Sequence, residues 1–224
     1  MLKENLEKVL FEIANGNNLG EPITLVGATK TMSVETINQA ISYGLKVVAE
    51  NKVQEFNQKS EFINGAEQHF IGHLQTNKVK YLVGKVSLIH SVDSLRLANE
   101  INRVAIKKNV VQEVLVEINV GGELSKSGYS FENAINGVLE IVNSCANVKV
   151  VGLMAMLPHL DDSDALANLT KKMRTLYDHL INYGLPFKYL SVGMSNDYKT
   201  AILNGSNMIR LGRTIFGERN YGVH

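Results

Sequence analysis

Short apolar runs alternate along the chain with longer segments in which apolar residues recur every three or four positions. The first pattern predicts buried β-strands and the second predicts amphipathic helices. The predicted strands lie at 23–30, 45–49, 69–73, 86–90, 114–120, 148–156, 189–193 and 208–212. Eight strand-then-helix units follow one another without a linker or a shift in composition. We therefore expect an α/β protein with a (β/α)8 TIM barrel rather than an open doubly wound sheet.

Helix signals fill the intervals between these strands. Serine stands where an N-cap is expected at Ser33, Ser94, Ser130 and Ser195. A polar helix is predicted through Val53 and Phe56, and another over 74–82. Apolar residues of the charged segment 1–13 also fall at helical spacing, which predicts an extra N-terminal helix before the barrel rather than a signal peptide.

The composition narrows the class of protein. The chain has 224 residues, 45% of them apolar, so one domain spanning 1–224 is the simplest expectation. Its 23 Lys and Arg residues balance 22 Asp and Glu residues, which gives no reason to expect a nucleic-acid or membrane partner. The sole cysteine, Cys145, excludes an internal disulfide and suits a reducing compartment. No apolar run is long enough to span a bilayer, so we expect a cytoplasmic protein.

Lys30 is the candidate nucleophile, because it ends the first apolar run among small neighbours. A lysine that is partly buried there would favour its neutral amine, which forms Schiff bases with carbonyl groups. Alternatively, Lys30 lies past the strand end with its ammonium in water. The residue pattern at this one position leaves both interpretations open.

The other unusual residues lie where a barrel places its functional face, at the carboxyl ends of the strands. They are Lys30, Asn51, His73, Asn119 and Arg210, with Ser195 after the seventh strand. Free N–H groups near Ser195 and near Gly212 and Arg213 would form a phosphate site between the last two strand-end loops. The alternative for these positions is an ordinary helix cap and an ordinary strand-end glycine.

Arg210 lies on an apolar strand and should therefore point to a specific partner. Because a guanidinium keeps its proton, a ligand nitrogen that faces it is best left unprotonated. A structural salt bridge inside the barrel is the competing interpretation.

The sequence gives little support for other chemistries. His69 and His73 share one face of a predicted strand, but no third ligand accompanies them, so we expect no metal site. The remaining histidines are interpreted as packed or surface residues. No nucleophile elbow, Walker loop or dinucleotide-binding fingerprint is present in the sequence.

The motifs taken together resemble those of the pyridoxal phosphate homeostasis proteins, single-domain relatives of the alanine racemase N-terminal barrel. The resemblance covers essentially the whole chain and rests on the segments 26–31, 50–55, 69–78, 119–128, 190–197 and 209–217. It implies an alanine racemase N-terminal-domain-like fold with pyridoxal 5′-phosphate (PLP) as the cofactor. It also implies that Lys30 holds PLP as an internal aldimine.

The resemblance carries further roles over to individual positions. Asn51 would contact the ring region, Arg210 would face the pyridine nitrogen, and the phosphate would be held by Ser195, Gly212 and Arg213. The family often has a small hydroxyl residue where this chain has Arg213. The backbone N–H there remains as a phosphate contact, and the alternative contact is the arginine charge in place of the hydroxyl.

The function that we expect is PLP storage, buffering and delivery, without turnover. A neutral pyridine ring is a weak electron sink, which suits racemases but not most carbanion chemistry. The extra β-domain that supplies a second acid/base to racemases is not expected in this chain. We expect a monomer, with PLP-dependent apoenzymes as candidate recipients. The alternatives are a PLP-dependent amino-acid racemase and a Schiff-base aldolase that acts on a sugar phosphate.

Overall fold

The computed structural model describes residues 1–123 and 125–218. Within that part of the chain, eight parallel strands form a closed barrel in the order β4-β3-β2-β1-β9-β8-β7-β5, with β4 pairing β5 to close the ring. The two-residue strand β6 pairs only with the end of β5. The strands are β1 (Thr24–Ala28), β2 (Val47–Glu50), β3 (Glu67–Phe70), β4 (Leu88–Val92), β5 (Gln112–Asn119), β6 (Tyr129–Ser130), β7 (Val148–Ala155), β8 (Tyr189–Val192) and β9 (Met208–Leu211).

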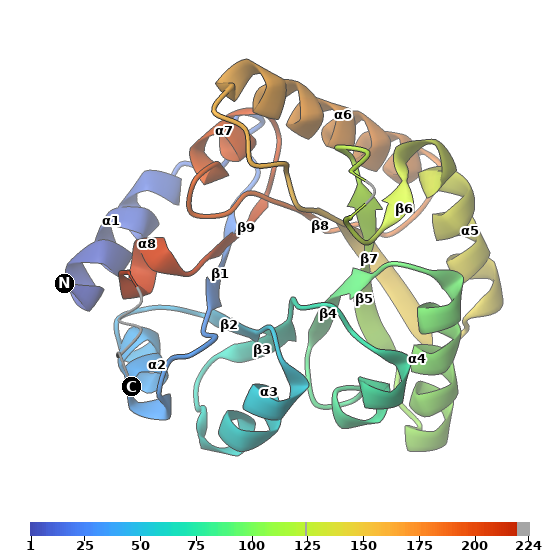
Figure 1. Ribbon diagram of the computed structural model, residues 1–224, viewed down its shortest axis with the longest axis horizontal. Helices are drawn as coiled ribbons and strands as arrows, with labels where there is room; N and C mark the ends of the chain where they lie inside the picture. Colours follow the sequence, from blue (N-terminus) through green and yellow to red (C-terminus); the bar gives the residue numbers. More distant parts are fainter. Residues whose placement is uncertain (124, 219–224) are drawn as a thin grey trace.

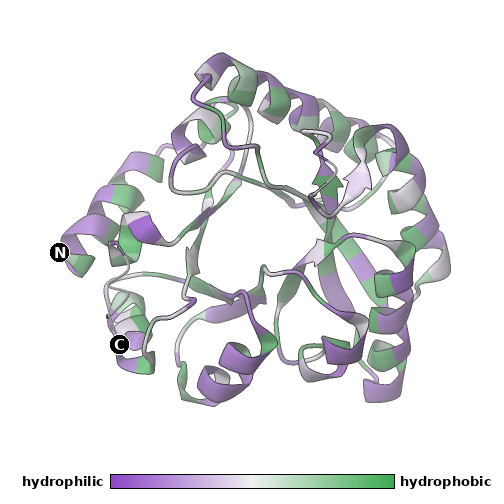
Figure 2. Ribbon diagram, in the orientation of Figure 1, coloured by the Kyte–Doolittle hydropathy of each residue, from purple (hydrophilic) through white to green (hydrophobic). Residues whose placement is uncertain are grey.

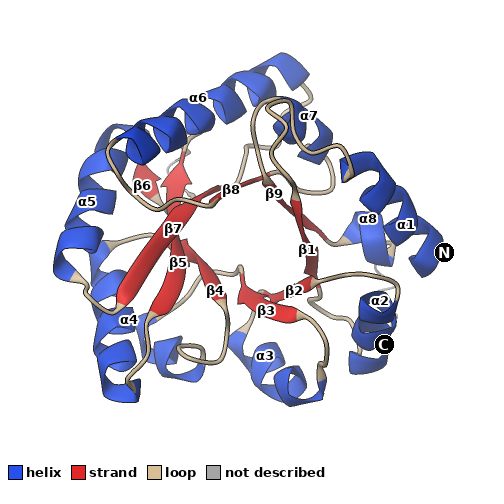
Figure 3. Ribbon diagram, turned by 180° about the vertical axis from the view of Figure 1, so that it is seen from behind, coloured by secondary structure: helices blue, strands red, loops and turns tan. Residues whose placement is uncertain are grey.

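Helices surround the strands as an outer ring (Figures 1 and 3). The α-helices are α1 (Leu2–Ile13), α2 (Val34–Ser42), α3 (Val53–Lys59), α4 (Leu95–Lys108), α5 (Ala134–Ser144), α6 (Ser163–Asn182), α7 (Tyr198–Leu203) and α8 (Arg213–Phe216). Short 3-10 helices are η1 (Ser60–Phe62), η2 (Thr76–Tyr81) and η3 (Phe131–Asn133). The helix α1 precedes the first strand, as the sequence predicts, and its buried residues share an apolar cluster with Leu25 of β1 and Ile209 of β9. The expected TIM barrel with an extra N-terminal helix is confirmed.

The core has two concentric parts. Small and medium apolar side chains fill the lumen: Val26, Val47, Ala49, Leu88, Leu115, Val151, Met154 and Met208. A larger apolar shell lies between the strands and the helices. The outer helices correspondingly carry both hydrophobic and hydrophilic bands in Figure 2, as expected for helices with one buried stripe. No described helix has a stretch long and apolar enough to cross a bilayer.

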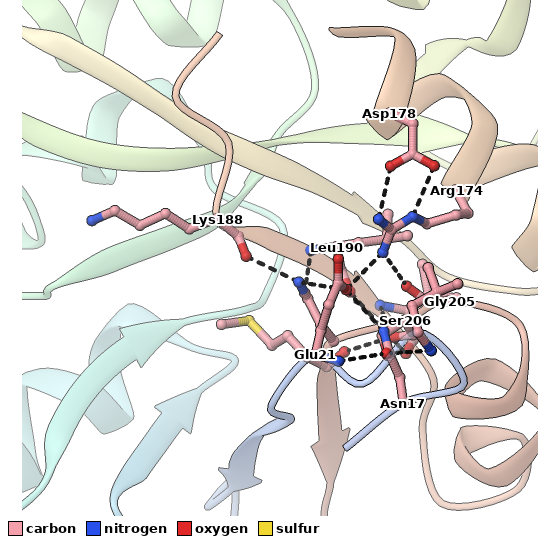
Figure 4. Close-up of polar contacts among 12 residues, drawn as sticks. Asn17, Glu21, Arg174, Asp178, Lys188, Leu190, Gly205 and Ser206 are labelled. Carbon is pink, nitrogen blue, oxygen red and sulfur yellow. Dashed lines mark hydrogen bonds and ion pairs between the residues drawn. The ribbon is translucent and has the colours of Figure 1, made fainter. Parts of the chain in front are cut away.

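A polar network fastens the amino ends of β1, β8 and β9, opposite the functional face (Figure 4). The guanidinium of Arg174 lies 2.6 Å from Glu21 and 2.8 Å from Asp178. Asn17 donates to the Glu21 carboxylate at 2.9 Å and to the carbonyl of Ser206 at 3.3 Å. The hydrogen bond from Arg174 lowers the pKa of Glu21. This network joins the segment before β1 to α6 and to the turn before β9.

Several boundaries differ from the sequence-based expectations. The third strand ends at Phe70 rather than His73, because the chain then turns across the barrel end. There the N–H of Ile71 donates to the carbonyl of Glu50 at 3.0 Å, and Ser91 donates to the carbonyl of Gly72 at 2.5 Å. The fourth strand begins at Leu88, two residues later than predicted.

The helix predictions also need corrections. Ser33 and Ser94 do cap α2 and α4, accepting from the N–H three residues on. Ser130 makes no such bond, because a 3-10 turn separates it from α5. Segment 74–82 holds only the 3-10 helix η2. The strand β6 was not predicted, because two residues carry no periodic signal.

Candidate functional site

The six residues that the sequence singles out as a binding site line one cavity of about 530 Å³. They are Lys30, Asn51, Ser195, Arg210, Gly212 and Arg213. They come from the carboxyl ends of β1, β2, β8 and β9, or from the loops that follow them. The cavity therefore lies over the seam where the first strand pairs with the last.

Lys30 lies in a turn, two residues beyond the end of β1, rather than on the strand itself. The residue is half-buried and contributes to the cavity wall. The turn is closed by the N–H of Met32, which donates to the carbonyl of Thr29 at 3.0 Å. The amine is thus carried on a short, hydrogen-bonded turn and not on a free loop.

Arg210 is almost fully buried in the barrel and reaches the cavity from β9. Its guanidinium donates to the hydroxyl of Ser191 at 2.6 Å and to the carbonyls of Ser191 and Ala155 at 2.7 and 3.0 Å. Burial lowers the pKa of Arg210 to about 10, and the charges of Asp197 and Glu117 oppose that shift. The group therefore remains a cation at neutral pH. Among the described residues, the partners of the guanidinium are a hydroxyl and two carbonyls rather than the carboxylate that the salt-bridge alternative requires.

A chain of buried polar groups continues behind Arg210. The hydroxyl of Ser191 lies 3.4 Å from Nδ1 of His90, whose Nε2 lies 3.0 Å from Nδ1 of His69. Burial lowers the pKa of His69 to about 4 and lowers that of His90 well below its ordinary value. Both imidazoles are therefore neutral at pH 7. Each ring then has one nitrogen that donates a hydrogen bond and one that accepts. This chain fixes the position of the Ser191 hydroxyl that receives Arg210.

Glu117 is a second buried charge that the sequence analysis did not single out. It is 3% exposed, and burial raises its pKa to about 7, with Asp93 adding to the shift and Arg210 opposing it. The sequence does contain a pattern that predicts inward-facing positions for Glu117 and His90. Each lies two positions along its strand from a lumen residue, Leu115 or Leu88, so the period of two places it on the inner face.

The loops after β8 and β9 meet at the other end of the cavity. The N–H of Thr214 donates to the hydroxyl of Ser195 at 3.4 Å, and the guanidinium of Arg213 donates to Oδ1 of Asn196 at 3.0 Å. Gly212 directly precedes α8. A hydroxyl, strand-end backbone and an exposed guanidinium thus converge on one place, which suits an anion such as a phosphate.

The expectation that Ser195 caps a helix was wrong. Helix α7 begins at Tyr198, and its N-cap residue is Asp197. The carboxylate of Asp197 accepts from the N–H of Met194 at 2.5 Å, which closes a turn over 194–197 before the helix can start. Gly193 precedes this turn with φ +108°, and a Cβ there would lie 2.9 Å from the Cβ of Ala201. Ser195 is therefore presented to the cavity by a tight turn.

Asn51 has a buried side-chain oxygen, Oδ1, with no hydrogen-bond partner among the described residues. Such an orphaned acceptor in a cavity wall is costly unless a bound group supplies a donor. Gly72 packs directly against the backbone of Asn51, where a Cβ would collide with its carbonyl. The position of Asn51 is thereby fixed toward the cavity.

The two histidines considered as possible metal ligands lie apart in the structure. His69 is buried in the barrel, whereas His73 is largely exposed and lies 3.4 Å from Asp93, so the two do not share a strand face. Among the described residues, no group of three or more potential ligands is arranged to hold a metal ion.

Comparisons with known proteins agree with this geometry. The family model of the alanine racemase N-terminal domain matches residues 21–220. The fold is thus that of an alanine racemase-type barrel.

Individual related proteins define the family within this group of barrels more closely. A pyridoxal phosphate homeostasis protein from Aquifex aeolicus is 44% identical, over 97% of this chain and 95% of its own. The chain belongs to the pyridoxal phosphate homeostasis protein family. Among solved structures, an unknown protein from Bifidobacterium adolescentis has a TM-score of 0.89 at 30% identity, covering 96% of this chain and 94% of its own. PipY of Synechococcus elongatus PCC7942, solved with PLP bound, has a TM-score of 0.84 at 25% identity, covering 97% of this chain and 100% of its own.

Proposed function

We propose that this chain is a cytoplasmic single-domain protein that binds PLP, stores and buffers it, and delivers it to PLP-dependent apoenzymes without turning over a substrate. The observation that carries the proposal is that Lys30, Arg210 and the loops around Ser195 and Gly212 border one cavity. An amine, an orphaned acceptor, a fixed cation and an anion site are the groups that an aldehyde-bearing pyridine phosphate needs. The same ligand is supported by the Aquifex aeolicus relative, a pyridoxal phosphate homeostasis protein, and by PipY, which was solved with PLP bound.

Each proposed role follows from the chemistry of the residue. Nζ of Lys30 would bond to the aldehyde carbon of PLP, with one water released and no change of oxidation state. Ser195, Gly212 and Arg213 would hold the phosphate, and the buried acceptor of Asn51 would meet a donor in the ring region.

Arg210 disfavours most carbanion chemistry, although an arginine facing the pyridine nitrogen also suits a racemase. PLP supplies an electron sink for carbanion chemistry when its pyridine nitrogen is protonated. A guanidinium that stays charged at neutral pH and is held by Ser191 and Ala155 would face that nitrogen and disfavour its protonation. The described residues that line the cavity include no tyrosine that could act as a second acid/base, although His159 is present at the wall. The alternative, a PLP-dependent amino-acid racemase, depends on such a group.

The decisive experiment is a visible absorption spectrum of the purified protein before and after PLP is added. We expect a band in the wild type that borohydride reduction abolishes and that Lys30→Ala lacks. Lys171→Ala, an exposed lysine on α6, is the matched control and should behave as the wild type. A wild-type protein that stays colourless with added PLP would contradict the proposal.

A second assay separates the carrier from the racemase. L- and D-amino acids are incubated with the loaded protein in heavy water, and loss of the α-proton is followed by NMR. We expect no exchange above free PLP. Exchange that depends on His159 would establish the racemase instead.

A further inference from the structure

The turn that carries Lys30 contains a strained residue. Thr31 has φ +67°, in the left-handed region, and among the described residues only Asn109 shares this property without being glycine. Asn109 is the C-cap of α4, where that conformation is ordinary. For a β-branched residue such as Thr31 the left-handed conformation is costly, and it persists only where the surroundings impose it.

A group of three charged residues contacts this turn; we call Glu50, Glu55 and Lys59 the clamp. The carboxylate of Glu55, on α3, accepts the backbone N–H of Thr31 at 2.8 Å. Nζ of Lys59, one helical turn further on, lies 2.8 Å from Glu55 and 2.9 Å from Glu50. The residue that follows Lys30 is thus hydrogen-bonded to a carboxylate that is itself held by an ammonium.

The clamp also holds the residue before Lys30. The hydroxyl of Thr29 donates to Oε1 of Glu50 at 2.8 Å and to the carbonyl of Ala49 at 3.1 Å. Lys59 donates to the carbonyl of Thr29 at 3.3 Å. Both backbone neighbours of Lys30 are therefore fixed by the same three side chains, although β1 has already ended at Ala28.

Burying these charged groups costs desolvation free energy, so stability alone does not explain the clamp. The side chain of Glu50 is 4% exposed and that of Lys59 is 13% exposed. Oε2 of Glu50 has no hydrogen-bond partner among the described residues. Burial raises the pKa of Glu50; burial also acts to raise that of Glu55, but Lys59 and the N–H of Thr31 bring it below its ordinary value. Buried ion groups contribute little net stability but do specify one geometry.

We propose that Glu55 and Lys59, seated on the buried carboxylate of Glu50, are positioning residues for Lys30: they hold its turn in the strained conformation that aims the amine at the aldehyde carbon of PLP. This inference rests on the proposed function and deepens it. The clamp touches neither the phosphate site nor the wall around Arg210, so it should govern the covalent step and not the capture of PLP.

The test compares total and covalent binding in Glu55→Ala and Glu55→Gln. Total PLP is measured by equilibrium dialysis, and the covalent step by the rate at which the borohydride-sensitive band appears. In Glu55→Ala we expect total binding at saturating PLP to be kept and the rate to fall about tenfold. Glu55→Gln keeps an oxygen that can accept from Thr31, so its rate should fall by a smaller factor, about threefold.

Two further variants distinguish positioning from general damage. Glu100→Ala removes an ion pair to Arg103 from α4, far along the chain from Lys30, and should leave the rate unchanged. Glycine adopts positive φ without strain, so Thr31→Gly combined with Glu55→Ala should recover part of the lost rate.

The outcomes separate this inference from the proposed function. A wild-type protein without the band would overturn the proposed function. A wild-type band with an unchanged rate in both Glu55 variants, or a double variant slower than Glu55→Ala, would overturn the clamp while the PLP site stands.

Discussion

The guanidinium of Arg210 donates two hydrogen bonds to Ser191, one to its hydroxyl at 2.6 Å and one to its backbone carbonyl at 2.7 Å. The two residues lie on adjacent strands, β9 and β8, so the contact bridges neighbouring strands of the barrel. A third bond to the carbonyl of Ala155 extends the contact to β7. One side chain thus ties three neighbouring strands together at the floor of the cavity.

The first prediction concerns the stability that this contact provides. Arg210→Met would leave the carbonyls of Ser191 and Ala155 without these buried donors, so the free energy of unfolding should fall by about 1 to 3 kcal/mol. Urea denaturation measures the change. Arg103→Met, on the exposed face of α4, is the control and should stay within about 0.5 kcal/mol of the wild type. Equal midpoints for Arg210→Met and the wild type would show that the buried cation contributes no net stability.

The second prediction concerns acid. Because burial lowers the pKa of His69 from 6.5 to about 4, the unfolded chain takes up a proton before the folded protein does. The stabilising contribution is fully present above pH 6.5 and is lost as the pH falls toward and through the folded-state value near 4. From pH 7 to pH 5, the wild type should lose about 2 kcal/mol more stability than His69→Gln.

Urea unfolding at the two pH values gives this difference. His179→Gln, an exposed histidine on α6, should keep the wild-type pH dependence. If His69→Gln also keeps it, then His69 is not the group that takes up the proton.

The third prediction concerns the phosphate end of the cavity. Arg213 is exposed, lines the cavity and is oriented by Asn196, so it should attract an anion without being buried itself. Arg213→Ala should weaken PLP binding about fivefold and make it less salt-dependent, while binding of pyridoxal, which lacks the phosphate, should change little. Arg96→Ala, exposed on α4, is the matched control. If Arg213→Ala weakens the binding of PLP and of pyridoxal equally, then Arg213 does not contact the phosphate.

The barrel could be predicted from the sequence because the same strand-then-helix pattern repeats along the chain. Eight apolar runs of strand length separated by helical patterns leave few topologies, and the strand-end rule then brought Lys30, Asn51 and Arg210 into one cavity. Their assignment as PLP contacts stays a prediction. The residue pattern alone left open whether Lys30 forms a Schiff base or lies with its ammonium in water. The resemblance to a known family favoured the Schiff base.

The errors arose where local geometry decides. Ser195 carries a good capping side chain, but Asp197 closes the preceding turn and moves the N-cap by two residues. His73 has the right spacing for a strand, but the chain has already left the sheet after Phe70. The role of Lys59 could not have been inferred, because a helical lysine in a polar segment is usually solvated, and only the tertiary contact with Glu50 shows otherwise.

The pairing of β1 with β9, which places Val26 beside Arg210, has a consequence for how the protein is made. These strands lie far apart in the sequence, so their contact closes the longest loop among the strand pairs of the barrel and carries the largest loop-closure entropy. The cavity spans that seam, with Lys30 after one strand and Gly212 after the other. A chain still emerging from the ribosome therefore cannot assemble the pocket until β9 has been synthesised, and a molecule that bridges both edges would slow the reopening of the barrel.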